Sequence, residues 1–301
     1  MDFRWPPPPE GRPDRYRPPV NRGPQTGRPT LPAPPTELVA TPHGVELECL
    51  IVDPPGTGVR SRPVTVFAHG LGGAIPDTRP LGSAVSGRKI FFHFRGHGRS
   101  AAPPGPWTYA DLARDLRAVA DLYGATRALG VSLGAGVLCR LIADNPGRFA
   151  RLVFFLPAVL DRPGPAAARA PLAALLAAVD DGDTTAVAEV VADEIPAEFR
   201  NTASARAFQR QRVDQLLRDG LAAAIAELPE QAAVPDLAAL ADVRAPALVI
   251  GCRGDDLHPV HVAERLAAQL PAAELHVYDA PGVLWTERAD LRDRIAGFLN
   301  R

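Results

Sequence analysis

The sequence contains no apolar run that approaches the ~20 residues needed to cross a bilayer. Two of its most apolar stretches, residues 152–156 and 245–250, are far shorter. Its first residues, Met-Asp-Phe-Arg-Trp followed by four prolines, also lack the apolar core of a secretory signal. From these absences we expect a soluble cytoplasmic protein.

The sequence also has few cysteines and almost no net charge. The three cysteines, Cys49, Cys139 and Cys252, are widely spaced in apolar segments, which predicts buried free thiols in a reducing compartment. Their spacing matches no metal site, and the sequence predicts neither a metal nor a cofactor. A net charge of −1 gives no general attraction to nucleic acid or to acidic lipid, so neither partner is expected.

Proline, in contrast, is abundant and is concentrated at the N-terminus. Residues 1–35 are rich in Pro, Arg and Gly and have almost no aliphatic side chains. Such a segment cannot bury enough apolar surface to offset its chain entropy, so a disordered or polyproline-like tail is predicted. A Pro-x-x-Pro ligand for another protein is the alternative interpretation.

After the tail, short apolar runs alternate with amphipathic ones. The apolar runs predict a hairpin of residues 38–40 and 45–53, then buried strands at 64–68, 89–94, 126–130, 152–156, 247–252 and 274–279. Helical periodicity predicts helices at 108–123, 133–144, 259–270 and 289–299, with a short one near 78–85. In the helix at 108–123, the apolar face is assigned to Leu112, Leu116, Val119 and Leu122.

This alternation is typical of an α/β protein with a doubly wound, mostly parallel sheet. It pauses at residues 157–240, which are Ala-rich, helical in period and interrupted by Pro and Asp. We therefore expect a core of residues 36–156 and 241–301 with an inserted helical cap at 157–240. The abundance of Ala, Leu and Val in the cap predicts an apolar pocket with few charged groups.

One short motif lies between a predicted strand and a predicted helix. Residues 130–134 read Gly-Val-Ser-Leu-Gly, and a serine on a sharp strand-to-helix turn needs neighbours without side chains. Such a turn would present the Ser132 hydroxyl beside the backbone N–H of Leu133, where an oxyanion could form. Taken alone, the motif also fits the small-residue start of a helix.

Two further segments make the chain, from about residue 37 onward, resemble the α/β-hydrolase family. Residues 69–73, His-Gly-Leu-Gly-Gly, resemble the loop after the third strand, which supplies an oxyanion N–H, here that of Leu71. Residues 94–100, Phe-Arg-Gly-His-Gly-Arg-Ser, resemble the turn after the fourth strand. The resemblance implies that Ser132 is the nucleophile and that Leu133 is the second oxyanion donor.

The resemblance also implies a triad carboxylate in the loop at residues 250–259. The spacing to Pro259 favours Asp255 for this role. Asp256 is then assigned as the N-cap of the following helix.

The family's catalytic histidine, which follows the last strand, is missing. Residues 280–287, Ala-Pro-Gly-Val-Leu-Trp-Thr-Glu, occupy its place. Because a serine without a base stays protonated, another residue must take that proton if the site is to work. The candidates are His258, in the acid loop, and His93, where the family usually has an Asp that holds the adjacent turn.

The other histidines are assigned to the scaffold. Structural or solvated roles are expected for His69 and His97 in the loop motifs, His43 in a remote turn, His276 with a satisfied ring in a strand, and His261 on the first turn of a helix. Two hypotheses remain open. The protein is a serine hydrolase acting on an ester or related acyl bond of a small hydrophobic molecule, or a degenerate relative that binds a small molecule or catalyses a non-hydrolytic step.

Overall fold

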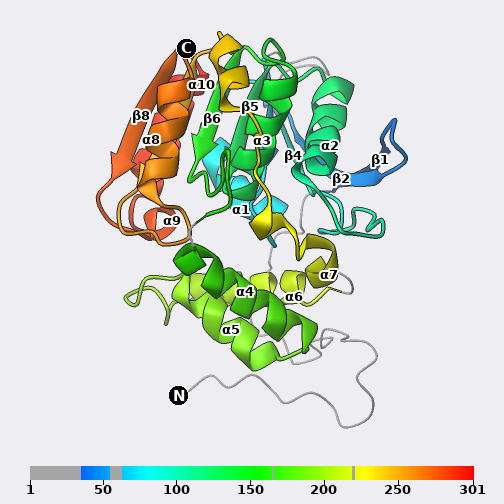
Figure 1. Cartoon of the computed structure of the whole chain (residues 1–301), viewed down its shortest axis with the longest axis vertical. Coiled ribbons are helices and arrows are strands. Elements are labelled where there is room, and N and C mark those ends of the chain that lie inside the picture. Colours follow the sequence, from blue (N-terminus) through cyan, green and yellow to red (C-terminus); the bar gives the residue numbers. More distant parts are fainter. Residues whose placement is uncertain (1–34, 55–62, 165, 219–220) are drawn as a thin grey trace.

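The computed structural model of the protein describes residues 35–54, 63–164, 166–218 and 221–301 (Figure 1). The predicted tail at 1–35 lies, except for its last residue, outside the described residues. Within the described part, eight strands form one sheet in the order β1-β2-β4-β3-β5-β6-β7-β8. Their bounds are β1 Glu37–Ala40, β2 Glu46–Val52, β3 Val64–Ala68, β4 Arg88–Phe92, β5 Arg127–Val131, β6 Arg151–Phe155, β7 Ala247–Cys252 and β8 Ala273–Tyr278.

The direction of the strands confirms the predicted doubly wound, mostly parallel sheet. β1 and β2 form the expected antiparallel hairpin, and β2 is also antiparallel to β4. The pairings from β4 through β3, β5, β6 and β7 to β8 are all parallel. The chain leaves β3 for β4 on one side and continues from β5 to β6 on the other. The carboxyl ends of β3 and β5 are therefore a topological switch point, where such sheets bind ligands.

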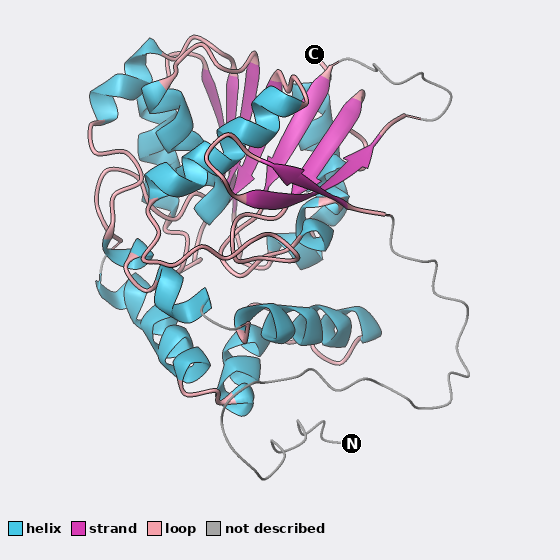
Figure 2. Ribbon diagram, turned by 90° about the vertical axis from the view of Figure 1, so that its right-hand side faces the viewer, coloured by secondary structure: helices cyan, strands magenta, loops and turns pink. Residues whose placement is uncertain are grey.

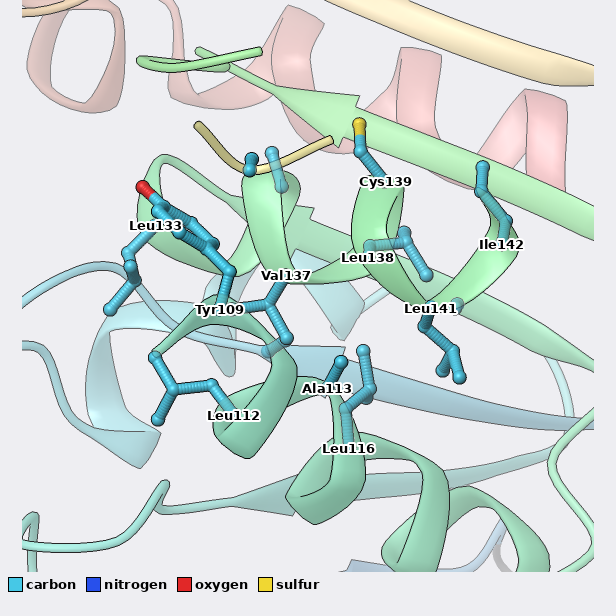
Figure 3. Packing of buried hydrophobic residues seen from close by; sticks show 14 of the residues in the cluster. Tyr109, Leu112, Ala113, Leu116, Leu133, Val137, Leu138, Cys139, Leu141 and Ile142 are labelled. Carbon is cyan, nitrogen blue, oxygen red and sulfur yellow. The ribbon is translucent and has the colours of Figure 1, made fainter. Parts of the chain in front are cut away.

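Helices cover both faces of the sheet (Figure 2). One apolar layer is formed with α2 (Tyr109–Leu122), α3 (Leu133–Asp144) and α8 (Val260–Gln269), and Figure 3 shows side chains of α2 and α3 meeting in it. The other layer includes α1 (Ile75–Thr78), the 3-10 turn at Pro80–Gly82 and α10 (Arg288–Leu299). The short helix expected near 78–85 is thus two pieces, each with a proline in its first turn, where proline fits a helix start.

Residues 157–240, here called the helical insertion, contain no strand among their described residues. They form α4 (Ala166–Asp180), α5 (Thr184–Asp193), α6 (Ala203–Leu216), α7 (Leu221–Ile225) and 3-10 turns at Leu228–Glu230 and Leu237–Asp242. Figure 1 shows α4 to α7 below the sheet, at the end toward which the parallel strands point. Their own apolar cluster comprises Leu175, Val187, Val191, Val213, Leu216 and Leu217. The limits of the predicted domains stay a prediction.

Helix α2 shows how well local signals specify an element and where they fail. Thr108 caps it: its hydroxyl accepts the N–H of Asp111, whose carboxylate accepts the Thr108 N–H in return. Leu112, Leu116 and Val119 are buried as expected. The assignment of Leu122 to the buried face is wrong, because this side chain is 57% exposed. It follows Leu116 by six residues, more than one residue short of two full helical turns, and so lies at the edge of the apolar face.

The two leucines give a matched test of this packing. Leu116→Ala should lower the free energy of unfolding by about 2–5 kcal/mol, because it leaves a cavity between α2 and the sheet. Leu122→Ala, the same change on the same helix, should alter it by no more than about 0.5 kcal/mol. Urea denaturation of both variants measures the difference. Equal losses would contradict the burial described for α2.

Candidate active site

Ser132 joins β5 to α3 in a strained backbone conformation, with φ 51° and ψ −111°. Positive φ is rare for residues other than glycine and is retained where the surroundings enforce it. A Cβ atom at Gly130 would collide with the Gly134 carbonyl, and one at Gly134 would collide with the Ala68 carbonyl. Both glycines of the motif are therefore required by close backbone packing, as the sequence predicted.

The loop after β3 lies directly beside Ser132. A Cβ atom at Gly70 would stand 3.9 Å from Ser132 Oγ. Within the described chain, the N–H groups of Leu71 and Leu133 donate no hydrogen bond, which leaves both available to a ligand at Ser132. The two predicted oxyanion donors thus come from residues adjoining the same serine.

The direction of the Leu71 N–H is set by the hydrogen bonds of the Gly70 carbonyl, which belongs to the same peptide bond. The Gly70 carbonyl accepts the Nδ1–H of His69 at 2.7 Å and the N–H of Gly73 at 3.0 Å. In a planar trans peptide the carbonyl and the following N–H point in opposite directions. Holding the Gly70 carbonyl with two donors therefore also orients the Leu71 N–H.

Asp255 shapes the loop after β7. Its Oδ1 accepts the backbone N–H groups of Leu257 at 3.1 Å and His258 at 3.0 Å. Its Oδ2 lies 3.0 Å from Nδ1 of His258, and since a carboxylate can only accept, Nδ1–H is the donor. Burial acts to raise the pKa of Asp255, but the bond and charge of the His258 ring and the two N–H groups outweigh it, so that this pKa is lowered.

The second ring nitrogen of His258 reaches the serine. Its Nε2 lies 2.8 Å from Ser132 Oγ, although the two residues are 126 positions apart in sequence. Because Nδ1 carries the proton donated to Asp255, Nε2 is free to accept the serine hydroxyl. Ser132, His258 and Asp255 therefore form one hydrogen-bonded chain in which the carboxylate and the imidazole come from the same loop.

Asp256 does not act as the helix cap that the sequence suggested. Helix α8 begins at Val260 after Pro259, and no side chain caps it. The preceding carboxylate, that of Asp255, accepts the N–H groups just before the helix and so replaces a cap at this turn.

His93 is fully engaged in holding the turn after β4. Its Nδ1 lies 2.9 Å from a carboxylate oxygen of Glu48, and its Nε2 accepts the N–H of Ile75 at 2.9 Å. This leaves no nitrogen to take a proton from Ser132. Sequence reasoning missed Glu48, although one acidic residue flanked by Leu47 and Cys49 in a buried strand is a signal of a buried ion pair.

The remaining histidines mostly follow expectation. His261 is exposed, His43 lies 2.8 Å from Asp115, and His97 is buried between loop groups. The prediction of a satisfied ring for His276 is wrong, because its Nε2 is buried without a hydrogen-bond partner in the described chain. This ring instead packs edge-on against Tyr278, with 4.5 Å between the ring centroids.

The segment where the family has its histidine has a packing role here. It forms α9 (Val283–Thr286), and the Trp285 ring packs against Phe199 and Phe208 of the helical insertion, with centroid distances of 6.0 and 5.6 Å. Sequence reasoning did not foresee this contact, since both phenylalanines lie far from Trp285 in sequence.

The state of the cysteines agrees with the sequence prediction. The three cysteines are buried free thiols. No group of His, Cys, Asp or Glu side chains in the described part of the chain could hold a metal ion. None of the helices described there has the length and apolar character to cross a membrane.

A strained serine turn at the switch point of a doubly wound sheet, with a histidine and a carboxylate beside it, defines a class of α/β proteins. A family model described as the alpha/beta hydrolase fold matches residues 63–282. The chain therefore belongs to the α/β-hydrolase family.

Similar proteins agree with this assignment. The chain is 35% identical over 104 residues to the putative carbamate hydrolase RutD of Caulobacter segnis, a match covering 33% of this chain and 39% of that protein. An enol-lactonase from Burkholderia xenovorans has a similar structure, with a TM-score of 0.73 and 23% identity over 88% of this chain and all of the other. An esterase from Exiguobacterium antarcticum also has a similar structure, with a TM-score of 0.70 and 16% sequence identity. The match covers 88% of this chain and 99% of the esterase. At such identities the two structures show the shared fold alone.

The rings of His69, His93 and His97 are buried beside the loop after β3, and the neutral state of one of them, His97, can be tested. His97 donates from Nδ1 to the Arg95 carbonyl and accepts the Gly72 N–H at Nε2, so it is neutral. Burial lowers the pKa of His97 to about 3. Between that value and the unfolded value of about 6.5, only the unfolded state binds the proton, so stability falls as the pH falls.

We predict that His97→Asn makes the free energy of unfolding less dependent on pH between about 6.5 and 4, whatever its effect at neutral pH. Denaturant titrations at several pH values measure this slope. His261→Asn, which removes an exposed ring, should leave the slope as in the wild type. A wild-type slope in His97→Asn would contradict a neutral, buried His97.

Proposed function

We propose that the protein is a serine hydrolase that cleaves an ester or related acyl bond of a small, largely hydrophobic molecule. The observation that carries this proposal is the 2.8 Å contact between His258 Nε2 and Ser132 Oγ, continued by the contact between His258 and Asp255. Through this contact His258 would act as the general base, because the segment after the last strand, where the family usually has its histidine, contains none. Membership of the α/β-hydrolase family and similarity to an esterase and an enol-lactonase add support.

The geometry suggests the following sequence of steps. Ser132 Oγ attacks the substrate carbonyl carbon while His258 Nε2 takes the hydroxyl proton. The carbonyl oxygen becomes an oxyanion, which accepts hydrogen bonds from the N–H groups of Leu71 and Leu133. His258 then gives its proton to the leaving group, and a water molecule activated by the same ring releases the acyl group from Ser132.

Asp255 has two tasks in this mechanism. Through Oδ2 it holds Nδ1–H of His258, so that the unprotonated nitrogen faces Ser132, and its charge stabilises the imidazolium that forms. Through Oδ1 it holds the backbone of the loop in the shape that places the ring. Loss of this carboxylate would therefore disturb both the electrostatics and the position of the base.

The first test asks whether Ser132 is an active nucleophile. A fluorophosphonate probe should label the wild-type protein at Ser132, and Ser132→Ala should not be labelled, because the reagent reacts only with a serine whose proton can be removed. Mass spectrometry of the labelled peptide identifies the site, with heat-denatured protein as the control. A folded protein that stays unlabelled would favour a degenerate relative that only binds its ligand.

The second test concerns the base. His258→Ala should lower kcat for a short-chain ester by about 10²–10⁴-fold, the usual contribution of a positioned general base. His261→Ala, three residues further along the same segment and exposed, should keep the wild-type rate. Steady-state kinetics of both variants decide the matter. An unchanged kcat in His258→Ala would remove His258 from the mechanism.

A further inference from the structure

Arg212, on α6 of the helical insertion, is a charged side chain without hydrogen bonds. Its side chain is only 18% exposed, and its Nε is buried with no hydrogen-bond partner. Glu194 lies 3.5 Å from this nitrogen without forming a hydrogen bond. Within the described chain, no N–H of the guanidinium donates to an acceptor. A buried charge is costly unless its hydrogen-bonding groups are satisfied, so an acceptor is missing here.

The guanidinium of Arg212 lies against the loop after β3, residues 69–73. A Cβ atom at Gly72 would stand 3.5 Å from Arg212 Nη1 and would overlap the side chain of Leu216, one turn further along α6. Gly72 directly follows Leu71, the predicted oxyanion donor. Arg212 therefore lies against the loop after β3 that carries the predicted oxyanion donor.

Gln215 adds a second unsatisfied donor on the same face of α6. It is 6% exposed, and its Oε1 accepts the N–H of Gly98 at 3.1 Å. Its Nε2 is buried and has no partner in the described chain. Gly98 follows His97, whose ring accepts the Gly72 N–H, so Gln215 contacts the same group of loops as Arg212. Because residues three apart share a helix face, both donors point to one region.

The nearby carboxylates do not satisfy these donors. Asp77 accepts the Ala74 N–H at 2.7 Å with Oδ2 and lies 3.4 Å from the Gln211 amide through Oδ1. Burial raises the pKa of Asp77, and the charge of Arg212 opposes this effect. Asp77 accepts no hydrogen bond from Arg212. The shortest distance between Arg212 and Glu194 is 3.5 Å, at Nε, and no hydrogen bond forms there. The N–H groups of the guanidinium can therefore still donate to a carboxylate of a ligand.

We infer that Arg212 and Gln215 form an anion subsite of the active site, which binds a carboxylate carried by the substrate next to the bond that is cleaved. This inference rests on the proposed function and narrows its substrate class. The substrate is a half-ester or lactone with an apolar part and a free carboxylate. It adds one charged group, Arg212, to the apolar pocket that the sequence predicts for the Ala-rich insertion.

A matched pair of esters tests the subsite by catalysis. Monoethyl glutarate carries a carboxylate where diethyl glutarate carries a neutral ester, and the scissile bond is the same. The wild type should prefer the half-ester, and Arg212→Met should lower the ratio of the two kcat/KM values by about 10- to 100-fold, as expected for a hydrogen-bonded charge. The ratio for Arg212→Lys should lie between those of the wild type and Arg212→Met, because lysine keeps the positive charge but lacks the planar guanidinium group. Arg210→Met, at an exposed position of α6, is the control and should keep the wild-type ratio.

Binding to Ser132→Ala separates this inference from the proposed reaction. Isothermal titration calorimetry should give a lower Kd for monoethyl glutarate than for diethyl glutarate. Adding Arg212→Met to Ser132→Ala should abolish this difference in Kd. If no ester is hydrolysed but this difference is seen, the subsite stands and the hydrolysis proposal fails. If the diester is hydrolysed and the wild type shows no preference for the half-ester, the subsite is overturned. Should Arg212→Met not fold, the wild-type preference and Arg212→Lys decide in the same way.

Discussion

The hydrogen bond between the His258 ring and the Ser132 hydroxyl is the contact on which the whole site depends. It requires a serine lifted from the sheet edge, and the positive φ of Ser132 provides this. It also requires a loop after β7 that reaches back across the end of β6, because β6 separates β7 from β5. Asp255 accepts the N–H groups of Leu257 and His258 as well as the His258 ring, so one carboxylate sets both the shape of the loop and the position of the ring.

The oxyanion side of the site is organised by neutral histidine rings. His69, His93 and His97 each accept one backbone N–H, those of Phe94, Ile75 and Gly72 respectively. On its other nitrogen, His93 is held by Glu48, whose pKa this bond lowers, against the opposing effect of burial. A protonated ring could not accept these N–H groups, and burial lowers the pKa of His69 and of His97, which favours their neutral form.

The sequence was sufficient for the elements and for the serine turn, because the signals for these are local. Apolar runs located β3, β5, β6 and β7 within one or two residues, and the Gly-x-Ser-x-Gly motif located the serine turn. What failed depended on contacts between distant segments. Glu48 with His93 and Trp285 with two phenylalanines join residues far apart in the chain, and no local period encodes them. Which of His258 and His93 lies near Ser132 likewise depends on the fold, which places His258 Nε2 2.8 Å from Ser132 Oγ.

The position proposed for the base has a physical consequence for the rest of the molecule. Neighbouring strands are about 4.8 Å apart, so a base from the loop after β8 must cover about 14 Å to reach the end of β5, whereas the loop after β7 must cover about 10 Å. A short loop folded by Asp255 can span the smaller distance. If His258 is the base, as proposed, the segment after β8 needs no histidine. Its Trp285 packs against Phe199 and Phe208, which joins the helical insertion to the core.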